Sequence, residues 1–200
     1  MKRKLIRLSV LTFAYLAVLY PLWFRYKNIS WSFDIDSILY NLFPGFGLAA
    51  FAILWLHAIS GVFEPWLRKY FDFDKYVRTT SLIVFFCLIL HPLLLLIILG
   101  FDFSELLAGG RYIMFGIVGW ILLITYDVGK LLSRKYDFFV RNWHNILLIS
   151  TIGFLLIFFH SINLGTDLQT GHLRNVWIFY GVTAFLATIH TYIIKKFRNR

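Results

Sequence analysis

The sequence predicts an all-α membrane protein, a six-helix transmembrane bundle with both termini in the cytoplasm. Of the 200 residues, 60% are hydrophobic and 20% are aromatic, whereas only 15% are charged. This composition lies far outside the average of soluble globular proteins, and the mean hydropathy is +0.72. Apolar segments long enough to cross a bilayer recur along the chain, and the basic residues cluster in the short loops between them.

Six apolar segments are expected to span the bilayer. The first, Leu8 to Phe24, follows a basic stretch, but it is longer than most signal-peptide cores and has no small-residue cleavage pattern. The others, in order, are Ile38 to Phe63, Val77 to Gly100, Tyr112 to Leu132, Trp143 to Leu164 and Val176 to Ile194. No soluble domain or glycine-rich nucleotide loop is recognisable. Residues 1–200 are therefore expected to form a single transmembrane domain, with no flavin or nicotinamide domain.

The basic residues predict the orientation of the chain. Of the 20 Lys and Arg residues, 16 fall at the two ends and in the second and fourth loops, and all of these positions share one face of the membrane. Because cytoplasmic loops carry an excess of Lys and Arg, this face is predicted to be cytoplasmic. The net charge of +10 comes from these short clusters and not from a continuous polar face, so nucleic acid is not an expected partner.

Histidines inside the apolar segments are the candidate functional residues. In the predicted orientation, His91 lies in the outer half of the third segment and His160 near the outer end of the fifth. An ionisable side chain at such depth is costly without a partner and is usually functional. Neutral imidazoles on facing helices can hold haem iron, and the single cysteine, Cys87, excludes a cysteine-based cluster within the chain. We therefore predict that His91 and His160 are the axial ligands of one haem iron. The alternative is two structural histidines that are bonded to backbone carbonyls.

Four stretches carry a resemblance to a known family: GFGLAAFAILWLHAISG, FDKYVRTTSLIVFFCLILHPLLL, GGRYIMFG and FFHSINLGTDL. Together they resemble the ferric reductase-like transmembrane domain family, which includes the haem-b membrane subunit of the methionine sulfoxide reductase system. The resemblance covers most of the chain from Gly45 onward. It implies a bundle in the bacterial inner (cell) membrane that holds one or two b-type haems between the third and fifth helices. The outer ligand positions of the family fall on His91 and His160, whereas the inner positions fall on Val77 and Leu147, which cannot ligate iron.

A second, inner haem is left open by the sequence. Its candidate ligands are His144 at the start of the fifth segment, and His57 and His190 towards the cytoplasmic ends of the second and sixth. Each has a structural alternative, either as an interfacial histidine or as one bonded to a neighbouring helix. Without an inner haem, much of a bilayer core of about 30 Å separates the outer haem from the cytoplasm. We then favour a quinol that enters from the membrane, with aliphatic side chains filling the inner site.

Some glycines and arginines are secondary candidates for the haem environment. The glycines that can admit a close helix or a porphyrin face are Gly45, Gly47, Gly116 and Gly119. Arg111 and Arg174, on the outer side, are candidates to pair with haem propionates.

Two functions of different classes follow from these observations. The first is a haem b-binding integral membrane electron-transfer protein that passes electrons from a quinol or a partner reductase to an acceptor at the outer face. Such an oxidoreductase component is expected to depend on a separate donor or acceptor protein. The second is a haem-free membrane interaction or assembly subunit. The missing inner ligands favour the second function, and the two retained outer histidines favour the first.

Overall fold

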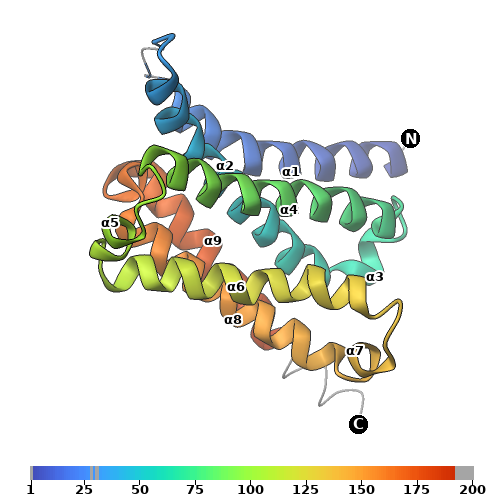
Figure 1. Cartoon of the computed structure of the whole chain (residues 1–200). Coiled ribbons are helices and arrows are strands. Elements are labelled where there is room, and N and C mark those ends of the chain that lie inside the picture. Colours follow the sequence, from blue (N-terminus) through green and yellow to red (C-terminus); the bar gives the residue numbers. More distant parts are fainter. Residues whose placement is uncertain (1, 28, 30–31, 192–200) are drawn as a thin grey trace.

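The computed structural model describes residues 2–27, 29 and 32–191, and they fold into a helical bundle (Figure 1). The long helices are α1 (Lys2–Tyr26), α2 (Ile35–Val62), α4 (Phe73–Ile98), α6 (Arg111–Leu132), α8 (Trp143–Leu164) and α9 (Gly171–Ile189). Short helices lie in the connections: α3 (Glu64–Leu67), α5 (Phe103–Ala108), α7 (Asp137–Arg141) and the 3₁₀ helix η1 (Thr166–Leu168). In Figure 1, α3 and α7 lie at the end of the bundle where α1 begins, and α5 lies at the opposite end.

The structure confirms the all-α fold and five helices that are long and apolar enough to cross a membrane, namely α1, α2, α4, α6 and α8. This set indicates an integral membrane protein in a lipid bilayer. The sixth predicted segment, Val176 to Ile194, does not join the set within the described residues. Its helix, α9, begins earlier, at Gly171, with a polar first turn, and residues 192–194 lie outside the described part of the chain, as do the basic residues after them.

Proline interrupts the backbone ladder of three helices, at Pro21, Pro44 and Pro92. Because proline has no N–H group, it leaves the carbonyl four residues before it without its helical partner, which is costly in hydrocarbon. A side chain from another helix donates to each freed carbonyl: Tyr180 Oη to Ala17 O at 2.9 Å, Arg25 Nη2 to Tyr40 O at 3.5 Å, and Trp120 Nε1 to Leu88 O at 2.7 Å. These bonds compensate for the proline interruptions and join α1 to α9, α1 to α2, and α4 to α6.

Helix α2 lies at the centre of the bundle and provides much of the buried core. Its Phe51 ring stacks on Phe154 of α8 with centroids 4.7 Å apart, and on Trp177 of α9 at 4.5 Å. Its Trp55 ring stacks on Tyr180 of α9 at 4.0 Å. All five side chains are buried. This aromatic cluster fixes α8 and α9 against one side of α2, while α4 packs along another.

Two glycines allow α6 and α8 to pack closely. A Cβ atom on Gly119 would lie 2.9 Å from Gly153 O, and one on Gly153 would lie 2.8 Å from Gly119 O. Small residues at such crossings let helices in a membrane gain dispersion contacts. The tight crossing holds α8, which carries His160, against α6.

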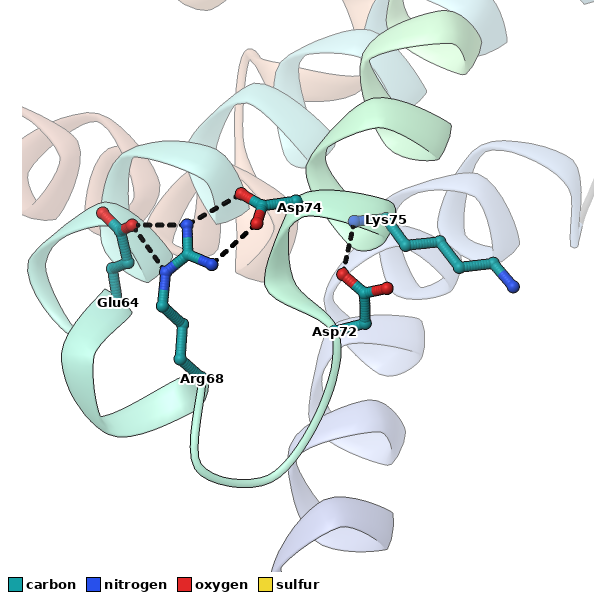
Figure 2. Close-up of polar contacts among 5 residues, drawn as sticks. All are labelled: Glu64, Arg68, Asp72, Asp74 and Lys75. Atoms are coloured by element: carbon teal, nitrogen blue, oxygen red, sulfur yellow. Dashed lines mark hydrogen bonds and ion pairs between the residues drawn. The ribbon is translucent and has the colours of Figure 1, made fainter.

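An ion-pair network closes the turn between α3 and α4 (Figure 2). Arg68 donates from Nη1 and Nη2 to both carboxylate oxygens of Asp74, at 2.8 and 2.7 Å, and from Nε to Glu64 at 2.9 Å. Asp72 caps α4 by accepting from the Lys75 backbone N–H at 2.9 Å. These contacts fix the point at which the chain enters α4, the helix that carries His91.

Candidate haem-binding histidines

His91 lies on α4 and points at the neighbouring helix α2. Its Nδ1–H donates to the backbone carbonyl of Phe43 over 2.7 Å. Because a carbonyl only accepts, Nδ1 must carry the proton, and the lone pair of the neutral ring is on Nε2. The ring packs against Gly47, where a Cβ atom would come within 3.0 Å of Cε1. Helix α2 thus sets both the tautomer and the position of this imidazole.

His160 repeats this arrangement on α8 and α6. Its Nδ1–H donates to the backbone carbonyl of Tyr112 over 2.8 Å, so its lone pair is also on Nε2. A Cβ atom on Gly116 would lie only 2.5 Å from Nδ1, so the ring fits only because that residue is glycine. The tight packing of α6 on α8 holds the carbonyl and the imidazole together.

The two arrangements share a sequence pattern that the analysis of the sequence missed. In each, an aromatic residue supplies the carbonyl, Phe-Gly follows three residues later, and the histidine lies 48 residues after the carbonyl. The two copies are Phe43 with Phe46-Gly47 and His91, and Tyr112 with Phe115-Gly116 and His160. In both helix pairs, α2–α4 and α6–α8, one helix therefore positions the histidine of the other in the same way. The equal spacings within the two copies are visible in the sequence and could have revealed the pattern.

Both Nε2 atoms remain available to a ligand. Neither nitrogen makes a hydrogen bond within the described residues. Neither is completely enclosed by the described part of the chain. Among the described residues, no group of three or more His, Cys, Asp or Glu side chains is placed so that it could hold a metal ion. Two imidazoles alone suit a metal whose other ligands come from a macrocycle, so these residues fit haem iron better than a free ion.

The candidates for a second haem are on three different helices. His57 on α2 uses Nε2 to contact Thr80 Oγ1 on α4 at 2.6 Å, so this nitrogen already has a partner. His144 is exposed in the first turn of α8. His190 follows α9, and its Nδ1 is buried without a partner among the described residues. The pattern seen at His91 and His160 is not found at His57, whose Nε2 is in use, or at His190, whose Nδ1 has no partner within the described residues.

Val77 and Leu147 are the two residues at the expected positions of the inner haem ligands, and both line the same cavity. They line a cavity of about 280 Å³ between α4 and α8, together with residues of α2, α6 and α9. The expectation that aliphatic side chains fill the inner site was therefore wrong. Valine and leucine are too short to close the gap between these helices, and a cavity remains.

Both arginines of the outer side that were named as candidates for haem propionates have partners within the protein. Arg111 is exposed and donates to the Tyr112 hydroxyl at 3.1 Å, and Arg174 donates to the Leu168 carbonyl at 2.8 Å, so Arg174 fastens the loop after α8. Arg25 has a largely enclosed side chain, which is 10% exposed, and its Nη1 lies 3.2 Å from Asp167 Oδ2. In the sequence, Arg25 is one of the four basic residues that lie outside the clusters assigned to the cytoplasmic face.

Comparison of the chain with models of protein families, with characterised proteins and with solved structures gave no match. Function is therefore inferred from the residues themselves.

Proposed function

We propose that this protein is a membrane cytochrome of the ferric reductase-like kind, which binds one b-type haem between His91 and His160 and transfers electrons across the membrane. The observation that carries the proposal is the matched pair of Nδ1–H bonds, which leaves two Nε2 lone pairs available. When bound, the haem supplies one-electron redox chemistry. The Phe43 and Tyr112 carbonyls fix the ring tautomers and make each Nε2 a better ligand.

A purely structural role of the two histidines explains the hydrogen bonds at Nδ1 but not the lone pairs at Nε2. Histidines bonded to carbonyls at Nδ1 can simply join helices, as the sequence analysis allowed. That role gives no reason for two Nε2 lone pairs, without donors, inside a bundle of apolar helices, where unpaired polar atoms are costly. An axial bond to iron supplies a partner for each. The glycines beside both rings also support a precisely positioned imidazole, because a Cβ atom at either position would press on the ring.

We also propose six spans with cytoplasmic termini in a bacterial inner membrane, and the charge distribution supports the choice of the cytoplasmic side. Among the described residues, 12 of the 16 Lys and Arg lie at the start of α1 and near α3 and α7. With that end in the cytoplasm, His91 and His160 lie in the outer halves of α4 and α8. Electrons would enter from a quinol or a partner reductase and leave to an acceptor at the outer face.

Histidine substitution tests the proposed ligands. The purified protein should show the reduced-minus-oxidised spectrum of a low-spin b-type haem. His91→Ala and His160→Ala should each abolish that spectrum, whereas His172→Ala, at an exposed position after η1, should leave it unchanged. Unaltered haem content in the His91→Ala, His160→Ala double variant would refute the assignment. A wild-type chain that folds without haem would favour the interaction or assembly subunit.

Reporter fusions test the topology separately. A reporter in the loop that contains α5, residues 101–110, and one in the loop that contains α7, residues 133–142, should give opposite signals. Equal signals at the two loops would overturn the outer position of the histidine pair.

A further inference from the structure

A cavity of about 280 Å³ lies on the α3–α7 side of the histidine pair. Its wall is mostly apolar, but one polar side chain or more from each of α2, α4, α6, α8 and α9 also faces it. The volume lies just below the range of about 300–1,000 Å³ that is usual for small-molecule sites. It therefore suits a compact ring system better than a porphyrin.

His57 supplies a hydrogen-bond acceptor to this cavity. Thr80 Oγ1 donates its proton to the Tyr76 carbonyl at 2.8 Å, so it can only accept from the imidazole Nε2 at 2.6 Å. The proton of the neutral ring is then on Nε2, and Nδ1 carries a lone pair. Nδ1 makes no hydrogen bond within the described residues and is not enclosed. Because His57 lines the cavity, this lone pair is available to a ligand.

Asp127 is an acidic residue in the wall of the cavity. It lies inside the membrane-spanning helix α6 and forms no ion pair or hydrogen bond with the described residues. Lys130, on the next turn, lies over the Tyr126 ring at 5.7 Å. An acid within a membrane-spanning helix that makes no hydrogen bond is a candidate functional group.

Hydrogen-bond donors are also present in the wall. The hydroxyls of Ser81 on α4 and Ser150 on α8 line the cavity and have no hydrogen-bond partner within the described residues. The cavity therefore offers one acceptor and one donor from the α2–α4 pair and one of each from the α6–α8 pair, within a mostly apolar wall. A flat ring with oxygen atoms on opposite edges matches this set, because such oxygens accept when they are carbonyls and donate when they are hydroxyls.

We infer that this cavity binds the headgroup of a membrane quinone or quinol, with His57 Nδ1 and Asp127 as acceptors from its hydroxyls and Ser81 and Ser150 as donors to its carbonyls. The inference deepens the proposed function, because it locates the electron donor. Leu88 is part of the cavity wall and lies three residues before His91, about 4.5 Å along α4. A ring in this cavity would lie next to the proposed haem site.

Binding of menadione, a naphthoquinone without a tail, tests the inference on the full chain in detergent. Isothermal titration should give saturable binding to the wild type. Val77→Phe, which fills the cavity with a ring, and His57→Gln should each weaken binding about tenfold or more, the effect of losing one good contact. The matched controls are Leu82→Phe, at a lipid-facing position of α4, and His172→Gln, and both should bind like the wild type.

Three outcomes would overturn the inference: no saturable binding by the wild type, equal binding by folded Val77→Phe and His57→Gln variants, or equal weakening by the controls. The His91→Ala, His160→Ala double variant separates the two proposals. Menadione binding by this variant should persist, because none of the proposed contacts involves haem. If the wild type binds menadione but no haem, the proposed function fails and the cavity assignment stands. If it binds haem but no menadione, the reverse holds.

Discussion

Replacing Tyr180 by Phe removes one hydroxyl and tests how the bundle tolerates proline. The ring is 5% exposed and stacks on Trp55, a contact that phenylalanine keeps. Only the bond from Oη to Ala17 O is lost, and Pro21 deprives that carbonyl of its helical donor. Side-chain hydrogen bonds between membrane helices contribute about 0.6 kcal/mol on average and about 1.7 at most. Because Ala17 O is left without any donor, we expect a loss near the upper value.

A double-mutant cycle isolates this bond. In a Pro21→Ala background, residue 21 regains an N–H group that can donate to Ala17 O within the helix. Tyr180→Phe should then cost less than about 0.5 kcal/mol, so the coupling energy should be about 1 kcal/mol. The assay is reversible unfolding of the purified protein in mixed micelles, followed by circular dichroism. Equal costs of Tyr180→Phe in both backgrounds would refute the idea that the tyrosine compensates for the proline.

Three further predictions concern packing, charge and pH. Gly119→Ala should destabilise the protein by about 3 kcal/mol in the same assay, because its new Cβ meets backbone, whereas Gly61→Ala, with nothing within 4 Å, should not; equal effects would contradict the tight helix crossing. Arg25→Gln should cost about 2–3 kcal/mol, because it leaves Asp167 unpaired in a largely buried position, and an unchanged midpoint would show that the pair is solvated. Asp102 accepts hydrogen bonds from the Ser104 side chain and from backbone N–H groups of α5, and they lower its pKa. The carboxylate therefore stabilises α5 above the ordinary pKa, and this support should fall away below about pH 4, as reduced amide protection in hydrogen exchange; protection that does not change down to pH 2 would contradict it.

Much of the fold could be predicted because hydropathy is a local property. The five segments that form candidate spans were located to within a few residues, except that α1 begins at Lys2 and not at Leu8. The predicted sixth span differs because the first turn of α9 is polar, so hydropathy over the described helix is lower. The short helices α3, α5 and α7 escaped prediction because four to six residues give no usable periodicity.

The contacts that define the candidate site could be predicted only in part. The depth of His91 and His160 in apolar segments singled them out, since a histidine there needs a partner. The carbonyls that hold them are 48 residues away in the sequence, and hydropathy carries no information about such pairing. The cavity beside Val77 escaped prediction for a different reason. Whether a valine closes a gap depends on the distance between helices, which only the packed structure provides.

Haem content of the wild-type protein tests the central claim most directly. The chain should be produced with ample haem supply, purified in mild detergent, and assayed by pyridine haemochrome absorbance against protein concentration. We predict one b-type haem per chain, in a low-spin state with two imidazole ligands, as judged by electron paramagnetic resonance of the oxidised form. A folded, monodisperse protein with no haem would contradict the account, and two haems per chain would contradict the single site between His91 and His160.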